Sequence, residues 1–477
     1  MSLTLAIALV LSLVLTACSS GTKKEEPSGV QTPQQATDSG PKGTLKYYLV
    51  DKPTTFDPVM VTDVSTNQII TNVFAGLVGF NEKGEVILDL AKGYTVSDDG
   101  LTYTFTLKDA QFSDGTPVTA ADFKRSILRA VNPDIASPTG ESYLNDIAGV
   151  AKYIAAKSEL NTQLKDKKIT DADFKSKVNA AFDALKNDPS ITVKDDKTLV
   201  MVIDAPKPFF LAKLTYPTAF VVGKAYADNA PMGAAPANVQ KMIGAGGFVM
   251  SSYEEGSKVT LKANPSYAGD KAKVATIEMP VITSPQAQLA AYRAGDIDIA
   301  PVPPGDYPTI KNDPELGKSL VEFATARINY LALNQVKFEA ARDVNFRLAV
   351  AHAIDKEKMV QVVYSGTHFP AYGVLPDSIA GANGAKIQKV GYDVAKAKEY
   401  LKKSGKEGIT FTFTYRAGDE VTERLAQFVQ SQLQTNLGIT VKLQPMEWGA
   451  LLTASRNKTE LEAFYLGWSA DYMDPQN

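Results

Sequence analysis

The feature that most constrains the fold of this chain is the mixture of strand and helix patterns that runs from residue 43 onward. Strands show alternating polar and apolar side chains, whereas helices show an apolar stripe with a period near 3.6 residues. The two patterns intermingle along the chain and do not separate into blocks, and no internal repeat is visible. The sequence therefore predicts a mixed α/β fold.

Two segments show the strand pattern most clearly, TYTFTLK at residues 102–108 and TFTFTY at residues 410–415. Shorter strands are expected at residues 198–203, 258–262 and 440–443. Alternation predicts the residues that share one face of the two long strands: Tyr103, Phe105 and Leu107 in the first, and Phe411, Phe413 and Tyr415 in the second.

Helix ends are marked by capping residues. Thr119 and Asp122 match a capping box variant, and Asp393 is expected to begin a helix that Gly405 ends. Thr422 is expected to open another helix, which stops before Gly438 and is followed by the strand-like ITVKL. The stretch from residue 153 to residue 188 is rich in Lys and Asp and predicts solvated helices on a peripheral lobe.

Length and charge narrow the class of protein. The chain has 477 residues with 44% apolar content, and single cores rarely grow beyond about 300 residues, so at least two lobes are expected. Ligands of such proteins usually lie between the lobes. Lys and Arg number 50 against 53 Asp and Glu, with no long basic run, which disfavours nucleic acid or an anionic membrane surface as a partner.

The N-terminal residues 1–17 form an apolar run that is too short to span a bilayer comfortably and ends in small residues before Cys18. This pattern predicts a signal peptide. The segment LTAC at residues 15–18 resembles the lipobox of bacterial lipoproteins, which implies that the Cys18 thiol carries a lipid. An ordinary secretory signal with a stray cysteine is the alternative, and the usual basic residue after Met1 is missing.

Residues 18–42 are expected to form the lipidated cysteine and a flexible tether. They hold no aromatic residue and Val30 as their one branched aliphatic residue, and they are rich in Ser, Thr, Gln, Pro and Gly. A flexible coil of this length reaches roughly 25 to 30 Å. The tether would hold a globular body near the membrane while lifting it off the lipid headgroups.

Catalytic and metal-binding patterns are scarce. The chain contains no nucleophile elbow, P-loop, zinc-protease helix or calcium loop, and its only histidines are His352 and His368. The apolar surroundings of His352 favour a structural role over a ligand role. We therefore expect a binding protein without enzymatic activity, metal or cofactor.

Two further segments have ordinary structural explanations. The glycines between Gly244 and Gly247 lack the companion residues of a phosphate-binding loop and predict a tight turn with close backbone contact. Asp296 and Asp298 alternate with isoleucines and predict a strand with one solvated face, with paired catalytic carboxylates as the less favoured alternative.

The most unusual segment is GWSADYMDP at residues 467–475, which holds one of the two tryptophans of the chain. An aromatic pair around an acid suits a half-buried site for a cation, because the rings exclude water and the carboxylate supplies charge. The alternative is a core Trp468 followed by an Asp471 in a turn.

Several motifs in order give the chain a family resemblance: residues 55–77, the segment from Ser97 through residues 102–123, NPSYAG at residues 264–269, RLAVAHAIDKEKMV at residues 347–360 and GWSADYMDP. Together they resemble the extracellular solute-binding proteins of peptide-importing ATP-binding-cassette transporters, the oligopeptide-binding proteins. The resemblance implies a two-lobed fold of the periplasmic-binding-protein type II, in the peptide-binding class with an extra domain.

By the same resemblance, residues 43–84 and 190–280 form lobe I, residues 85–189 the extra domain and residues 281–477 lobe II. The chains of this family continue past the ADY motif, so we expect that the C-terminal part of lobe II is missing from this sequence.

The resemblance also implies a binding site. Asp471 would receive the α-ammonium of a peptide, and an empty closed site would leave that carboxylate without a partner. Tyr465 stands where peptide binders carry Arg, and Ala245 stands where they carry Asn, so contacts there differ. The remaining ligand-facing positions are Gly467, Trp468, Ser469, Gly246, Gly247, Val64 and Thr139, the last in place of an aromatic residue.

The function implied is that of a substrate-binding lipoprotein, which captures extracellular oligopeptides and delivers them to the permease subunits of an importer. The same scaffold binding a signalling peptide, nickel, haem or an oligosaccharide is the alternative. We expect a monomer that is anchored through lipid to the outer face of the cytoplasmic membrane. Ser19, where some Gram-negative lipoproteins carry Asp, favours a Gram-positive-type host.

Overall fold

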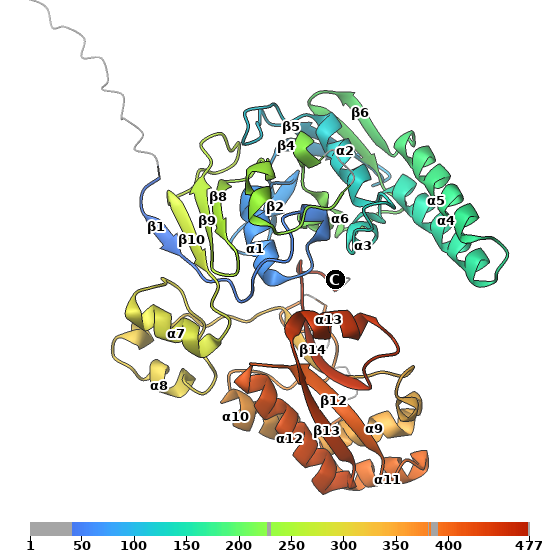
Figure 1. Cartoon of the computed structure of the whole chain (residues 1–477), viewed down its shortest axis with the longest axis vertical. Coiled ribbons are helices and arrows are strands. Elements are labelled where there is room, and N and C mark those ends of the chain that lie inside the picture. The colour runs from blue at the N-terminus through green and yellow to red at the C-terminus, as the bar shows by residue number, and fades with distance from the viewer. Residues whose placement is uncertain (1–40, 227–229, 380, 383–389, 476–477) are drawn as a thin grey trace, which may run out of the picture. The chain divides into compact units, whose positions relative to one another are not determined.

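The computed structural model describes residues 41–226, 230–379, 381–382 and 390–475. The predicted signal peptide at residues 1–17, the lipidation site Cys18 and the tether as far as residue 40 lie outside this range. The described part alternates helices and strands throughout, which confirms the mixed α/β class (Figure 1).

The first four-stranded sheet has the order β1-β10-β9-β8. Its central strands run antiparallel, and β1 joins the edge in parallel. Helix α1 (Val64–Val73) packs against it and buries Ile69 and Ile70 in a shared apolar cluster. The strand bounds are Thr44–Lys46 for β1, Phe248–Glu254 for β8, Lys258–Ala263 for β9 and Thr276–Pro280 for β10.

A second sheet has the order β4-β5-β7-β6 and is entirely antiparallel. Tyr103, Phe105 and Leu107 are buried on one face of β5, as the alternation predicts. Helix α2 (Ala120–Ala130) covers this core, and a separate hairpin pairs β2 with β3. The bounds are Val78–Phe80, Val86–Leu88, Ala91–Val96, Thr102–Leu107, Ile191–Asp195 and Thr198–Val202 for β2 to β7.

The third sheet, β11-β14-β12-β13, lies in the C-terminal half (Figure 1). Phe411, Phe413 and Tyr415 are buried as predicted, and the burial of Thr414 shows that β12 is covered on both faces. Burying a phenylalanine side chain stabilises a fold by about 1.5 to 3 kcal/mol. The bounds are Arg327–Leu333, Thr410–Arg416, Thr440–Met446 and Ala463–Ser469 for β11 to β14.

The remaining helices connect and cover these sheets. Helices α4 and α5 pack together as a pair, where the Lys-rich stretch predicts solvated helices, and α9, α11 and α12 pack together beside the third sheet (Figure 1). Their bounds are Gly140–Leu144, Ala148–Lys165, Asp171–Lys186, Phe210–Lys213, Pro285–Ala294, Tyr307–Lys311, Val344–Ala353, Lys356–Tyr364, Val394–Ser404, Glu420–Leu437 and Trp448–Arg456 for α3 to α13.

Most capping predictions are confirmed. Thr119 and Asp122 form a complete capping box, Asp393 caps α11, and Gly405 ends it in the left-handed conformation at φ 63°. The prediction that Thr422 opens α12 is wrong, because the side chain of Asp419 caps the helix by accepting from the backbone N–H groups of residues 421 and 422.

The predicted strand around Asp296 and Asp298 is also wrong. Residues 296–298 belong to no strand, and the single bridge in this segment joins Ile299 to Tyr47. Asp298 instead holds the end of β1, because its carboxylate accepts a hydrogen bond of 2.7 Å from the Lys46 N–H.

The predicted domain boundaries stay predictions. The sheet β4-β5-β7-β6 takes strands from both sides of residue 190, because β6 and β7 begin after it. Among the described residues, no helix combines the length and the apolar character needed to cross a membrane.

Candidate functional site

The unusual C-terminal segment begins on β14 and continues beyond it. In the register between β11 and β14, Gly467 lies opposite Asn329 and Ser469 opposite Arg327. One more hydrogen bond follows beyond the ends of both strands, 2.8 Å from the Ala470 N–H to the Ala326 carbonyl. Gly467, Trp468 and Ser469 therefore lie within β14, and Asp471 follows two residues after the strand ends.

Asp471 meets a pair of tyrosines from another part of the chain. The hydroxyl of Tyr143, on α3, donates a short hydrogen bond to the Asp471 carboxylate. The Tyr143 ring stacks on Tyr216, with ring centroids 3.9 Å apart and planes 12° from parallel. The Tyr216 hydroxyl donates to the Val61 carbonyl at 3.2 Å, which anchors the stack.

Burial raises the pKa of both Tyr143 and Tyr216, and the charge of Asp471 raises each pKa further. Both phenols therefore stay protonated at neutral pH, and Tyr143 acts as a hydrogen-bond donor. A carboxylate beside two stacked rings is an environment that attracts a cation. The cation site that the sequence predicts at Asp471 has this character.

Thr139 and Val64 lie around the short helix Pro217–Ala219, which contacts both α1 and α3. The Thr139 hydroxyl is buried and shares a 2.6 Å hydrogen bond with the Thr218 hydroxyl. Val64 is the first residue of α1 and is 57% exposed, so it can contact a ligand. Of these two predicted positions, Thr139 serves the packing around Tyr216.

Gly246 and Gly247 lie at the opposite end of α1 from Val64, about 14 Å along the helix axis. The Gly246 N–H donates to the Val73 carbonyl at 2.9 Å, and a Cβ on Gly246 would meet the Asn72 carbonyl oxygen at 2.6 Å. The predicted close backbone contact is confirmed, and residues 246 and 247 form a bend. The geometry gives Gly246 a packing role, and its contact with ligand stays a prediction.

Trp468 is 50% exposed, so the alternative of a core tryptophan is wrong. The Tyr465 hydroxyl lies 2.9 Å from that of Tyr364. Burial and the neighbouring Tyr364 raise the pKa of Tyr465, which keeps this hydroxyl protonated. The position where the sequence resemblance suggests that peptide binders can carry Arg therefore holds a neutral pair of hydroxyls.

Tyr143 and Tyr216 were not predicted as site residues. Tyr143 lies four residues after Thr139 on the same helical turn, and that spacing is the one signal in the sequence that could have found it. Tyr216 comes from a segment without a recognisable pattern.

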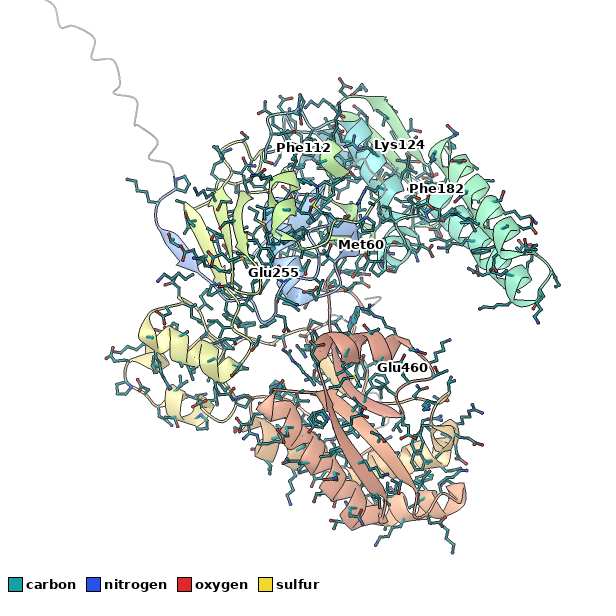
Figure 2. All side chains as sticks on the ribbon, in the orientation of Figure 1. Met60, Phe112, Lys124, Phe182, Glu255 and Glu460 are labelled. Carbon is teal, nitrogen blue, oxygen red and sulfur yellow. The ribbon has the colours of Figure 1, made fainter. Side chains whose placement is uncertain are left out.

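Other candidate sites are less suited to binding. The Nδ1–H of His352 donates a 2.7 Å hydrogen bond to the Gly391 carbonyl, and its ring stacks on Tyr400, which confirms its structural role. No cluster of three or more potential metal ligands occurs within the described residues. A cavity of about 360 Å³ lies away from Asp471, between α2 and α5, where Lys124 and Phe182 form part of its lining (Figure 2).

Comparisons with known proteins agree with this picture. A family model described as "Bacterial extracellular solute-binding proteins, family 5 Middle" matches residues 85–477 of this chain. The oligopeptide-binding protein OppA of Bacillus subtilis (strain 168) is 28% identical over 485 residues, covering 98% of this chain and 82% of OppA. The periplasmic murein peptide-binding protein MppA of Escherichia coli (strain K12) is 29% identical over 485 residues, covering 97% and 81%.

The structure agrees as well. The solved structure of the Escherichia coli murein tripeptide binding protein MppA superposes with a TM-score of 0.76 at 28% identity, covering 91% of this chain and 81% of that one. The two-lobed solute-binding fold that the sequence predicts is thereby confirmed.

Proposed function

Because the chain belongs to the bacterial extracellular solute-binding proteins of family 5, we propose that it captures oligopeptides outside the cell and delivers them to an ATP-binding-cassette importer. The names of its relatives as oligopeptide-binding and murein peptide-binding proteins support a peptide as the ligand. The observation that carries the proposal is the carboxylate of Asp471 beside the stacked rings of Tyr143 and Tyr216.

The chemistry of this site fits a peptide N-terminus. An ammonium group at Asp471 gains a charge-assisted hydrogen bond, and the two rings nearby exclude water from it, which together offset its loss of water. The strand that carries Gly467 and Ser469 offers main-chain groups beside it, and an extended peptide can use such groups without any reading of its sequence. Binding of this kind requires no catalysis, and the protein releases its ligand unchanged.

The N-terminal segment supports an anchored protein. Cys18 at the lipobox, followed by the flexible residues 19–42, would hold the body at the outer face of the cytoplasmic membrane. The body acts there as a monomer, close to the permease subunits that receive the peptide. Ser19 supports a Gram-positive-type host.

The test compares trialanine with N-acetyl-trialanine by titration calorimetry on the full chain. Removing one partner of a buried charge pair costs about 2 to 5 kcal/mol, so acetylation should weaken binding by about 30-fold or more. Asp471→Asn should weaken binding of the free peptide similarly, and the two changes together should cost less than their sum. Asp171→Asn, at an exposed acid on α5, is the matched control.

Equal affinity of the wild-type protein for the free and acetylated peptides would contradict the proposal. Asp471 would then not bind an amine, and a different solute on the same scaffold would become the better explanation.

A further inference from the structure

Helix α2 buries one face in the core and lines a cavity with another. Phe123, Ile127 and Ala130 are buried in a large apolar cluster. Lys124 and Leu128, four residues apart, share a different face of the helix and line the cavity of about 360 Å³ between α2 and α5. Small-molecule sites have volumes of roughly 300 to 1,000 Å³. The cavity therefore has room for a small organic molecule.

Every charged side chain among the described residues that line this cavity is basic. These side chains are Lys124, Arg125, Arg129 and Lys186. Three of them pair with acids that do not line the cavity: Arg125 with Asp122, Arg129 with Asp57 and Lys186 with Asp183. Lys124 forms no ion pair with a described residue. The cavity therefore offers no partner to the ammonium of a peptide, and its positive walls attract an anion.

Asn132 contributes a neutral donor at the far end of the lining. Lys124 lies about 9 Å along the helix axis before the end of α2 at Ala130, and Asn132 lies beyond that end. The Asn132 side-chain oxygen accepts a 3.0 Å hydrogen bond from the Asp134 N–H, which fixes the orientation of the amide. Its NH₂ group has no hydrogen-bond partner among the described residues and keeps some surface accessible to solvent, although Asn132 is only 8% exposed. This donor can bind an acceptor in the cavity.

Apolar side chains complete the lining. Leu128 lies between the two polar ends, and the nearly buried Phe182 contributes its ring from α5 (Figure 2). The Tyr226 hydroxyl already donates a 3.0 Å hydrogen bond to the Phe56 carbonyl, so Tyr226 offers the cavity its ring. Rings and aliphatic side chains favour burial of the apolar part of a ligand.

We propose that this cavity is a second binding site, for a small organic anion whose charged group lies beside Lys124. The apolar part of the anion packs against Leu128 and Phe182, and an acceptor at its other end receives a hydrogen bond from Asn132. A lysine ammonium is a compact charge that suits a carboxylate or a phosphate group. None of the described residues that line the cavity belongs to the site at Asp471, so we expect the two sites to bind independently.

The experiment measures binding to the full chain by ligand-observed NMR titration. The probe 4-acetylbenzoate combines a negative charge, an apolar ring and an acceptor opposite the charge. Among the comparison compounds, 4-acetylbenzamide lacks the charge, benzoate lacks the acceptor and inorganic phosphate lacks the apolar part. We expect 4-acetylbenzoate to bind most tightly, at least about 3-fold more tightly than the neutral amide.

Two variants test whether the probe binds in this cavity. Lys124→Gln should weaken binding of 4-acetylbenzoate about 2-fold to 5-fold, because it removes one partly exposed charge. Asn132→Asp keeps the acceptor for the Asp134 N–H but replaces the donor with a negative charge, and it should weaken binding by about 10-fold or more. Lys175→Gln, at an exposed lysine on α5, is the matched control and should behave as wild type.

Equal affinity for 4-acetylbenzoate and its amide, or no saturable binding of either, would overturn the proposal. Unchanged affinity in both Lys124→Gln and Asn132→Asp would overturn it as well, because the probe would then bind elsewhere. Benzoate or inorganic phosphate that binds as tightly as the probe would overturn the role of the acceptor or of the apolar lining. Asp471→Asn should not change binding of 4-acetylbenzoate, and Lys124→Gln should not change binding of trialanine, so this site and the proposed function can fail separately.

Discussion

Asp57 and Arg129 form an ion pair whose removal should destabilise the protein strongly. Arg129, on α2, donates two hydrogen bonds to Asp57, of 2.8 Å and 2.6 Å, and both side chains are almost fully buried, at 4% and 0% exposure. Backbone N–H groups of Val59 and Met232 donate to the same carboxylate at 3.3 Å and 3.1 Å. Each carboxylate oxygen therefore accepts from two donors.

Asp57→Asn keeps the shape of the side chain and removes its charge. Whichever way the amide turns, its NH₂ group faces two donors, and the Arg129 charge is left without a counter-charge in a buried place. Breaking a buried pair in this way costs about 3 to 5 kcal/mol. Replacing both partners, as in Asp57→Leu with Arg129→Met, should cost less than the sum of the single changes because neither charge then remains.

Urea titration followed by circular dichroism measures these free energies of unfolding. The control is Asp183→Asn, which breaks an exposed pair with Lys186 at 67% and 49% exposure and should cost less than about 1 kcal/mol. If the free energy of unfolding of Asp57→Asn lies within about 1 kcal/mol of that of the wild type, the ion pair is more hydrated than its burial indicates. That result would contradict the prediction.

Two further predictions follow from single residues. Cys18→Ser should abolish incorporation of labelled fatty acid and release the protein into the medium, and label retained by the variant would contradict a lipid at Cys18. Burial, and to a smaller extent the charge of Arg327, hold the pKa of His368 below its usual 6.5. Arg327→Gln should therefore raise the midpoint of the NMR titration of His368. The variant His368→Gln assigns the signal. An unchanged midpoint would place the Arg327 charge away from His368.

Local chemistry explains which elements could be predicted. The two residues of the capping box, Thr119 and Asp122, are three positions apart, and the alternation from residue 102 onward is a property of a single strand. In both cases the residues that produce the structure lie within a few positions of one another in the sequence. The start of α12 was missed because Asp419 and Thr422 are both good capping residues, and their spacing does not decide between them.

Tertiary contacts explain the errors. Four alternating residues around Asp296 fit a strand, yet the neighbours of this segment are at Lys46 and Tyr47, some 250 positions earlier, where only one bridge can form. The role of Asp57 was likewise hidden, since the family motif marked the residue but its partner Arg129 lies 72 residues away. Nothing in either local segment indicates the other.

Tyr143 provides a hydrogen-bond donor to Asp471 when no ligand is bound. The sequence led us to expect that the Asp471 carboxylate would be left without a partner when no ligand is bound, which would disfavour closure. The hydroxyl of Tyr143, 328 residues away in sequence, already donates to that carboxylate, so this expectation is wrong. If Asp471 binds a ligand ammonium as proposed, the ammonium adds Coulomb attraction to a hydrogen bond that exists without it. The free energy that favours the occupied site is then smaller than it would be if the empty site left the Asp471 charge without a hydrogen bond. The proposed function therefore requires other contacts with the ligand besides Asp471.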